Sequence, residues 1–140
     1  MKLVVDTSIL FAALLKKSAV RELLLNPFFE FYVPEFCIEE VEKHVDEIVD
    51  RSGLALENVY LLVSVLLASV QVVPTERILK RCKESERVIG KIDRDDVPFV
   101  ALALSFPNDG IWSEDTHFLR QKKVKVWRTR DLLKLVKATI

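Results

Sequence analysis

Cysteine, glycine and nucleotide-binding motifs are scarce or missing in this sequence of 140 residues. Its 2 cysteines, Cys37 and Cys82, stand far apart with no CxxC pair, so we expect free thiols rather than a disulfide or a thiolate metal site. The 3 glycines occur singly, and no P-loop or GxGxxG motif is present, which argues against a nucleotide cradle. Neither Ser8 nor Cys37 has a well-placed histidine, so the sequence does not support nucleophilic catalysis by either.

A long hydrophobic run is missing as well. The longest apolar stretch, from Val59 to Val73, is too short to span a bilayer and ends at Pro74. The first expected strand reaches Asp6 with no room for a secretory leader before it. We therefore expect a cytoplasmic protein with no membrane segment.

The chain has no excess of charge of one sign, because 21 basic residues balance 21 acidic ones. The charges are unevenly distributed, however, since residues 120–140 hold 8 basic residues and 1 acidic residue, Asp131. Such a flank can contact nucleic-acid phosphates, but an ordinary solvated surface explains it equally well. The candidates for contacts with an RNA backbone are Arg120, Lys122, Lys123 and Arg128.

The remaining composition is that of a folded α/β domain. Half of the residues are hydrophobic and 30% are charged, which excludes disorder, and the length suits one domain, residues 1–140. The alternation of strands and helices predicts a central parallel sheet covered on both faces, a three-layer α/β/α fold. Strands are expected at 2–5, 31–33, 71–73, 110–112 and 124–127. Helices are expected at 7–16, 18–25, 35–50, 56–69, 75–89, 96–106, 116–121 and 129–138.

Acidic residues stand at the junctions where an open α/β sheet gathers its functional side chains. Asp6 directly follows an expected strand, Asp115 comes three residues after the end of another, Glu40 lies early in a helix, and Asp96 opens another helix. Ligands of such sheets bind at the carboxyl ends of the strands. Carboxylates crowded there repel one another unless a hard cation such as Mg²⁺ or Mn²⁺ lies among them. The pattern therefore indicates metal-dependent chemistry on a phosphate ester.

Two of these acids have an alternative role as helix caps. Asp6 and Asp115 each precede an expected helix, and aspartate is a good N-cap residue. An aspartyl-phosphate mechanism at Asp6 would need a second aspartate two positions later, where Ser8 stands. Capping and metal binding both stay open for Asp6 and Asp115.

Helical geometry separates Glu40 from its neighbour Glu39. An apolar stripe at i, i+4 spacing includes Cys37, Val41 and Val45. At about 100° per residue, Glu40 flanks this stripe whereas Glu39 points away from it. The alternative for Glu40 is an ordinary acid in the first turn that complements the helix dipole.

Asp96 is expected on the buried side of its helix, where a carboxylate needs a partner or a metal. Asp95 is the expected cap of that helix, and Asp93 is a candidate secondary ligand. Ser113 is a candidate for orienting a carboxylate or a water molecule. The 2 histidines, His44 and His117, are isolated in the sequence and are expected at the surface.

Taken in order, four parts of the chain resemble the PIN-domain family: Val4 to Ser8, Pro34-Glu35 followed by Glu40-Val41, Asp96 to Ala103, and Ile111 to Asp115. The resemblance covers essentially the whole chain. It implies a compact parallel-sheet fold and, as in many members, ribonuclease activity that depends on Mg²⁺ or Mn²⁺. It places Asp6, Glu40, Asp96 and Asp115 in the metal site, with Asp93, Ser113 and Thr7 as secondary residues.

Two functional hypotheses follow from these observations. The first is an RNA endonuclease that hydrolyses phosphodiester bonds, with the basic flank holding the RNA. Small prokaryotic members of the family are often toxins of toxin–antitoxin pairs, so the resemblance adds an antitoxin protein as an expected partner. The second is a non-catalytic module that binds a protein through the apolar helix at 56–69. Because that helix has almost no polar face, we also expect a homodimer.

Overall fold

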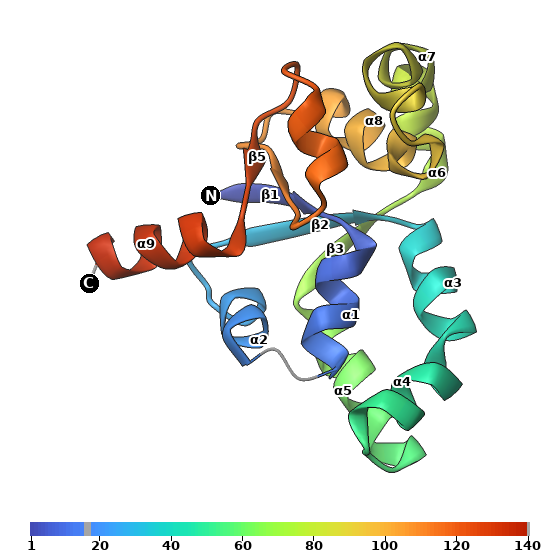
Figure 1. Cartoon of the computed structure of the whole chain (residues 1–140), viewed down its shortest axis with the longest axis vertical. Coiled ribbons are helices and arrows are strands. Elements are labelled where there is room, and N and C mark those ends of the chain that lie inside the picture. The colour runs from blue at the N-terminus through green and yellow to red at the C-terminus, as the bar shows by residue number, and fades with distance from the viewer. Residues whose placement is uncertain (16–17, 140) are drawn as a thin grey trace.

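The computed structural model describes residues 1–15 and 18–139, which build a five-stranded sheet between two layers of helices (Figure 1). The strand order is β3-β2-β1-β4-β5, and every neighbouring pair is parallel. The predicted parallel α/β/α fold is therefore confirmed. The strands are β1 (Lys2–Val5), β2 (Glu30–Pro34), β3 (Val70–Val73), β4 (Ile111–Trp112) and β5 (Val126–Trp127).

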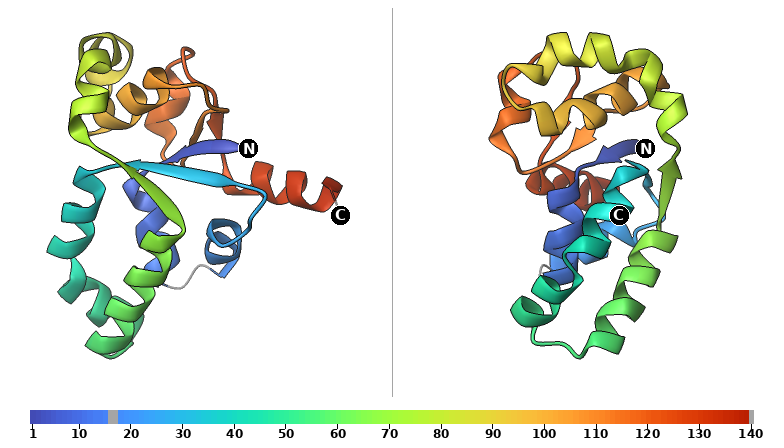
Figure 2. Two further views of the ribbon diagram at one scale, coloured as in Figure 1. Left: turned by 180° about the vertical axis from the view of Figure 1, so that it is seen from behind. Right: turned by 90° about the vertical axis from the view of Figure 1, so that its right-hand side faces the viewer.

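Helices lie on both faces of the sheet, with α6 to α8 on one side and α1, α2 and α5 on the other (Figures 1 and 2). On the first side, α8 packs directly against β1, β2 and β4. The α-helices are α1 (Thr7–Leu15), α2 (Ser18–Leu24), α3 (Phe36–Lys43), α4 (Val45–Ser52), α5 (Leu56–Ala68), α6 (Thr75–Ile78), α7 (Cys82–Ser85), α8 (Val97–Ser105) and α9 (Thr129–Thr139). The shorter turns are η1 (Leu79–Arg81), η2 (Glu86–Gly90, a π-helix), η3 (Arg94–Asp96) and η4 (Thr116–Arg120).

The central strand is apolar after its first residue, Lys2, because helices cover both of its faces. Leu3, Val4 and Val5 of β1 are fully buried. Phe31 of β2 and Trp112 of β4 pack together with their ring centroids 5.4 Å apart. Such a continuous hydrophobic run, without alternation, is typical of a central parallel strand.

The sheet reverses its direction of growth between β1 and β4. The chain adds β2 and β3 on one side of β1, then crosses over and adds β4 and β5 on the other. At such a switch point the loops leave in opposite directions and open a crevice at the carboxyl ends of the strands. Asp6 follows β1 at this point and Ser113 follows β4. The fold thus positions two of the predicted site residues side by side.

Gly110 is required at the start of β4. Its φ of 127° is rarely adopted by other residues, and a Cβ there would overlap the carbonyl oxygen of Lys125. That oxygen accepts the Ile111 N–H at 2.9 Å. The close approach sets the register of β4, whose carboxyl end carries Ser113 and Asp115.

Three of the expected elements differ from the structure. The helix expected at 35–50 breaks at His44, which has φ −107° and ψ 15°, and α4 then turns onto α1 and α5. The helix expected at 75–89 is a chain of short turns from α6 to η2 that wraps around α8. The strand expected at 124–127 is only β5, because the Gln121 side chain binds both backbone groups of Val124. Residue 16, the expected end of the first helix, lies outside the described residues, as does residue 17 at the expected break.

The apolar helix α5 buries one side and exposes another. Val59, Val63 and Leu66 are buried, whereas Leu61 and Val65 are exposed. In the described part of the chain, no single helix is long and apolar enough to cross a membrane. The pair α4 and α5 reaches that length and composition together, but it is bent by 110° at its break.

Candidate metal site

All four predicted acids line one pocket of about 400 Å³ at the switch point of the sheet. They come from four different places in the chain: the end of β1, the helix α3, the turn η3 and the loop after β4. We call this the acidic pocket. Its described lining is Asp6, Thr7, Ser8, Phe36, Glu40, Arg94, Asp95, Asp96, Pro98, Phe99 and Asp115.

Asp6 is buried at the base of the acidic pocket and is held by three hydrogen-bond donors. Its Oδ1 accepts from Ser8 Oγ at 2.5 Å and from the Ile9 N–H at 3.1 Å, and its Oδ2 accepts from Ser113 Oγ. The bond to Ile9 caps α1, so Asp6 is a helix cap and a pocket residue at once. Burial raises the pKa of Asp6, the three hydrogen bonds oppose this, and the charge of Asp115 adds to it.

Asp96 is buried without such compensation. Its side chain comes from the turn η3, and burial raises its pKa to about 7, with the charges of Asp93, Asp115 and Asp6 adding to the effect. His117 acts in the opposite direction. In the described chain, the Oδ2 atom of Asp96 is buried and has no hydrogen-bond partner. A buried carboxylate oxygen without a donor is costly unless a cation lies beside it.

The cap of the turn before α8 is Asp93 rather than the predicted Asp95. The Asp93 side chain accepts the Asp95 N–H at 2.9 Å, while Asp95 itself is exposed. Asp93 is the cap because a 3₁₀ turn, η3, precedes α8, and the first free N–H groups therefore belong to that turn. This bond fixes the Asp93 carboxylate next to Asp96.

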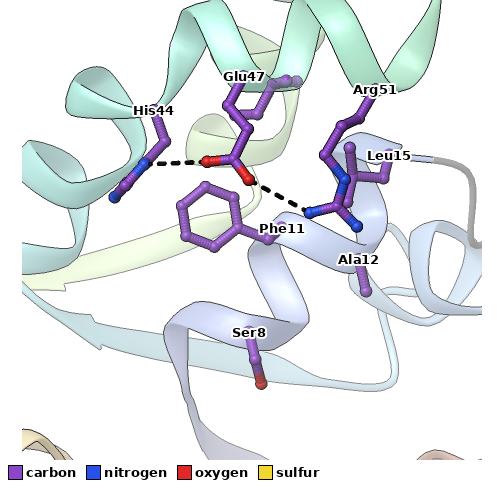
Figure 3. Close-up of a pocket in the computed structure, with 8 residues that line it drawn as sticks. Ser8, Phe11, Ala12, Leu15, His44, Glu47 and Arg51 are labelled. Atoms are coloured by element: carbon purple, nitrogen blue, oxygen red, sulfur yellow. Dashed lines mark hydrogen bonds and ion pairs between the residues drawn. The ribbon is translucent and has the colours of Figure 1, made fainter.

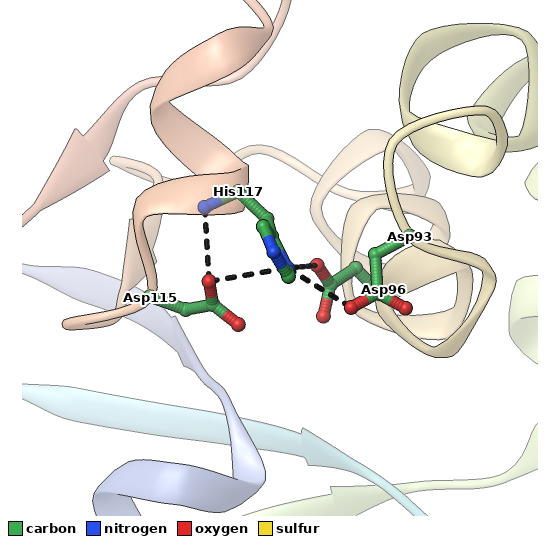
Figure 4. Close-up of side chains that lie close together, drawn as sticks. All are labelled: Asp93, Asp96, Asp115 and His117. Atoms are coloured by element: carbon green, nitrogen blue, oxygen red, sulfur yellow. Dashed lines mark hydrogen bonds and ion pairs between the residues drawn. The ribbon is translucent and has the colours of Figure 1, made fainter.

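Four side chains on the turns η3 and η4 and the loops before them converge on one point (Figure 4). Each offers one ligand atom, and these atoms lie within 4.8 Å of one another. His117 is in the middle, with Nδ1 at 2.9 Å from Asp93 Oδ2, 3.3 Å from Asp115 Oδ1 and 3.8 Å from Asp96 Oδ2. We call Asp93, Asp96, Asp115 and His117 the Asp/His cluster.

The Asp/His cluster fits a divalent cation. Asp96 Oδ2 and His117 Nδ1 are both buried without a hydrogen-bond partner in the described chain, and the short approach of Nδ1 to Asp93 lacks hydrogen-bond geometry. Carboxylate oxygens suit Mg²⁺ and Mn²⁺, and an imidazole nitrogen extends the set to later transition metals. The donor set can therefore hold one such ion.

His117 is the cluster member that the sequence interpretation missed. It was expected to be an isolated surface residue, yet its imidazole lies among three carboxylates and its side chain is 42% exposed. The available signal was its position two residues after Asp115. Asp115 Oδ1 accepts the His117 N–H at 2.9 Å, which caps η4 and holds His117 where its imidazole meets Asp93 and Asp96. The capping role expected for Asp115 is thus what positions His117.

Glu40 lines the acidic pocket outside the Asp/His cluster. Its side chain is 36% exposed and lies 3.7 Å from Lys43 Nζ and 3.8 Å from His44 Nε2. Glu39 is exposed on the other side of α3, as the helical-face argument predicted. His44 is near the surface, where its Nδ1 also lies 3.3 Å from Glu47. Glu40 is therefore the most accessible of the four predicted acids, although Asp115, with a side chain that is 34% exposed, is nearly as accessible.

Ser113 and Thr7 have different structural roles beside the acids. Ser113 is fully buried, donates to Asp6 Oδ2 and accepts the Asp115 N–H at 2.9 Å, so its hydroxyl joins two of the acids. Thr7 lines the pocket, but its Oγ1 is paired with Cys37 Sγ at 3.1 Å and ties α1 to α3. Burial raises the pKa of the Cys37 thiol to about 12, so it stays protonated.

The predicted basic flank does not line the acidic pocket. Arg120, Lys122 and Lys123 are exposed, and Arg128 is held by Glu114, whose carbonyl accepts from Arg128 Nη2 at 3.1 Å. The basic residue in the described lining is Arg94, on η3. Arg94 was not among the predicted site residues, because the aspartates around it dominate that segment of the sequence.

A second pocket, of about 520 Å³, shares Ser8 with the acidic pocket but differs in chemistry (Figure 3). It is built from apolar residues of α1 and from α4, along which Glu47 pairs with His44 and Arg51. Among the described residues that line it, Glu47 is the carboxylate, and it lies 3.4 Å from Arg51 Nη1. The lining is Ser8, Phe11, Ala12, Leu15, His44, Glu47, Ile48 and Arg51. It offers no ligand set for a metal.

Carboxylates and an imidazole gathered at the switch point of a parallel sheet define a candidate divalent-metal site of the kind found in phosphodiester hydrolases. The family model of the PIN domain matches residues 4–137, and the chain belongs to the PIN-domain family. PIN domains are usually metal-dependent nucleases, and the acidic cluster here can bind the metal that such an activity needs. No curated protein matches the chain in a sequence search.

Proposed function

We propose that this protein is an Mg²⁺- or Mn²⁺-dependent RNA endonuclease that hydrolyses phosphodiester bonds. The observation that carries the proposal is the Asp/His cluster, in which Asp96 Oδ2 and His117 Nδ1 are buried, close together and without a hydrogen-bond partner within the described chain. The PIN-domain family supports the class of activity. Carboxylates crowded together with no cation repel one another and destabilise the fold, so the cluster indicates a binding role.

Asp96, Asp115 and Asp93 would hold the ion through carboxylate oxygens, with His117 as a nitrogen ligand. A divalent ion bound there neutralises charge on a phosphate oxygen and lowers the pKa of water. Asp6 would contribute from the base of the pocket, since Ser8, Ile9 and Ser113 fix both of its oxygens. Its orientation therefore does not have to be organised when substrate binds.

Glu40 is assigned a different role on the opposite wall of the pocket. Its carboxylate is partly exposed, and its neighbours Lys43 and His44 are at 3.7 and 3.8 Å, which leaves its oxygens accessible. We assign Glu40 to orienting the attacking water and accepting its proton at an Oε atom. Phe36 and Phe99, with ring centroids 5.4 Å apart, form an apolar wall that limits water in the pocket.

The test is cleavage of a fluorescently labelled single-stranded RNA by the purified full chain. Cleavage is expected with Mn²⁺ or Mg²⁺ and is expected to stop with EDTA or in Asp115→Asn. Glu39→Gln, on the exposed side of α3, serves as the matched control and is expected to cleave normally. If a folded wild-type chain binds Mn²⁺ but cleaves neither RNA nor DNA, the endonuclease proposal is wrong. The non-catalytic interaction module would then be favoured.

The role as a toxin with an antitoxin partner is a further part of this proposal, and it rests on the resemblance to small prokaryotic PIN proteins. Induced expression is expected to arrest bacterial growth, and Asp96→Asn is expected to relieve the arrest. Normal growth with an active enzyme present would contradict the toxin role while leaving the nuclease proposal intact. A toxin of this kind would act in the cytoplasm, where its RNA target would be.

A homodimer through α5 is the remaining proposal. Leu61 is 66% exposed and Val65 is 43% exposed, while Leu66 is buried in the core. Exposed aliphatic residues on one helix face support a protein contact. Light scattering is expected to give twice the mass of 16.1 kDa. Leu61→Glu is expected to give the monomer. Leu66→Glu would damage the core and would not test the interface.

A further inference from the structure

A basic cleft adjoins the acidic pocket on the segment from α7 to η3. It has a volume of about 660 Å³, and it shares Arg94 with the acidic pocket. Its described lining holds four basic residues and one acid: Lys83, Glu86, Arg87, Gly90, Lys91 and Arg94. Two neighbouring hollows of opposite charge therefore meet at Arg94.

The basic side chains of the cleft are available to a ligand. Lys83, Arg87, Lys91 and Arg94 are all exposed. Among the described residues, no acidic group lies within 4.0 Å of the amino or guanidinium nitrogens of Lys83, Arg87 or Lys91. Arg94 lies 3.7 Å from Glu86, but both side chains are more than half exposed, so this pair is weak. The cleft thus keeps a net positive charge.

The spacing of the basic residues gives the cleft a direction. Lys83, Arg87 and Lys91 follow one another at intervals of four residues along α7 and the π-helix η2, so successive basic residues lie about one helical turn apart. Arg94 continues the row to the mouth of the acidic pocket. A row of cations that tracks toward a buried site suits a linear polyanion rather than a compact anion. Grooves of this kind follow the backbone of single-stranded nucleic acids.

We propose that the cleft formed by Lys83, Arg87, Lys91 and Arg94 binds the phosphodiester backbone of single-stranded RNA beside the bond to be cut. This rests on the proposed nuclease function and names the path of its substrate. Asp6 and Asp96 are 4% and 7% exposed, so the reacting phosphate must enter a recess. A single strand can bend into such a recess while its flanking phosphates stay on the cleft, whereas a stiff duplex cannot.

Glu86 gives the proposal a second, opposite test. It is the acid in the described lining, and its Cγ would lie 2.8 Å from a Cβ at Gly90, so the glycine leaves room for the Glu86 side chain in the cleft wall. There it repels phosphate and attracts Arg94. Glu86→Gln is therefore expected to strengthen RNA binding, in contrast to changes at the basic residues.

The experiment measures binding of a labelled single-stranded RNA by fluorescence anisotropy at several KCl concentrations, in the Asp96→Asn background so that the RNA stays intact. Lys83→Gln, Arg87→Gln and Lys91→Gln together are expected to weaken binding at least about tenfold and to reduce the salt slope by about 2, since each single-strand phosphate contact contributes about 0.7. The charge-matched control changes Arg130, Lys134 and Lys137 of α9 to glutamine and is expected to have a much smaller effect. Glu86→Gln is expected to bind more tightly.

Three results would overturn the inference. The first is an equal loss of RNA binding in the cleft and α9 variants. The second is a larger loss of RNA binding in a variant of Arg120, Lys122 and Lys123. The third is a change in the binding of an acidic peptide, with RNA binding unchanged, in the cleft variant. Failure of the nuclease proposal is distinguishable from each of them. In that case the wild-type chain would not cleave RNA, while the cleft variants would still lose RNA binding and its salt dependence.

Discussion

The two sides of the acidic pocket are built differently, although the sequence presents their acids as equivalent. On one side, the Asp/His cluster is carried by short turns and loops, and it leaves Asp96 Oδ2 buried and without a hydrogen bond in the described chain. On the other side, Asp6 has three donors, and Glu40 is partly exposed beside Lys43 and His44. Asp96 is therefore the acid with the most to gain from a cation, whereas Asp6 already has hydrogen-bond donors and Glu40 faces water.

This difference separates two tasks within one pocket. Asp96 gains most from a cation, because its Oδ2 is buried and has no hydrogen-bond donor in the described chain. Carboxylates that already hold hydrogen bonds or face water gain less, but they keep a fixed or accessible geometry. We infer that the Asp/His cluster supplies metal affinity, and that Asp6 and Glu40 supply orientation. The following predictions test this division in order of expected effect on Mn²⁺ binding.

The largest effect is expected for Asp96→Asn. The amide keeps the shape but removes the charge, so Mn²⁺ affinity is expected to fall by at least about 100-fold. For the wild type, Mn²⁺ at roughly 100 times its Kd is expected to add about 2.7 kcal/mol of stability, or several degrees in Tm. Differential scanning fluorimetry should show this shift in the wild type and not in Asp96→Asn. An equal Tm shift in both would contradict the assignment of Asp96 as a ligand.

The second prediction concerns pH. The pKa of Asp96 is raised to about 7 from an ordinary value of 3.8, so between these values the folded chain keeps a proton that the unfolded chain releases. Stability of the metal-free protein is therefore expected to fall as pH rises toward 7 and to level off above it. Mn²⁺ competes with this proton, so its affinity is expected to rise over the same range.

Tm measured in EDTA and in Mn²⁺ between about pH 5 and 8.5 would check the sign. The gap between the two curves is expected to widen with pH. Asp96→Asn should reduce the slope of the EDTA curve but not abolish it, because burial also raises the pKa of Asp6. A metal-free protein that becomes more stable toward pH 7 would contradict the burial of an uncompensated carboxylate.

The sequence predicted the sheet and the acids because both depend on local rules. Apolar strands such as Leu3 to Val5 and the aspartates that follow them are recognisable from strand-to-helix junctions alone. The differences in burial and hydrogen bonding among the acids could not be predicted, since they depend on which hydrogen-bond donors other segments bring to each acid. Ser113 reaches Asp6 across 107 residues, and His117 reaches Asp93 only because η4 packs near η3. The break at His44 likewise follows from the packing of α4.

A third, smaller effect is expected for His117→Ala. Loss of one nitrogen ligand is expected to lower Mn²⁺ affinity about tenfold, and to lower Mg²⁺ affinity less, because imidazole favours transition metals over Mg²⁺. Isothermal titration of both ions would measure the change in the Mn²⁺/Mg²⁺ ratio. The other histidine gives the control: His44 lies 3.8 Å from Glu40 and outside the cluster, so His44→Ala is expected to leave the ratio unchanged. Equal ratios in the wild type and His117→Ala would rule out a ligand role for His117.

The smallest effect is expected for Glu40→Gln. Its side chain is 36% exposed and lies outside the Asp/His cluster, so water screens its charge and Mn²⁺ affinity is expected to change by no more than about threefold. RNA cleavage is expected to fall by at least about 100-fold, since general-base catalysis is lost. Glu39→Gln, one residue away on the exposed side of α3, is expected to change neither quantity. If Glu40→Gln lost Mn²⁺ as completely as Asp96→Asn, the two sides of the pocket would be equivalent. Glu40 would then have to move toward the cluster when the ion binds, and its role would be ligation rather than proton transfer.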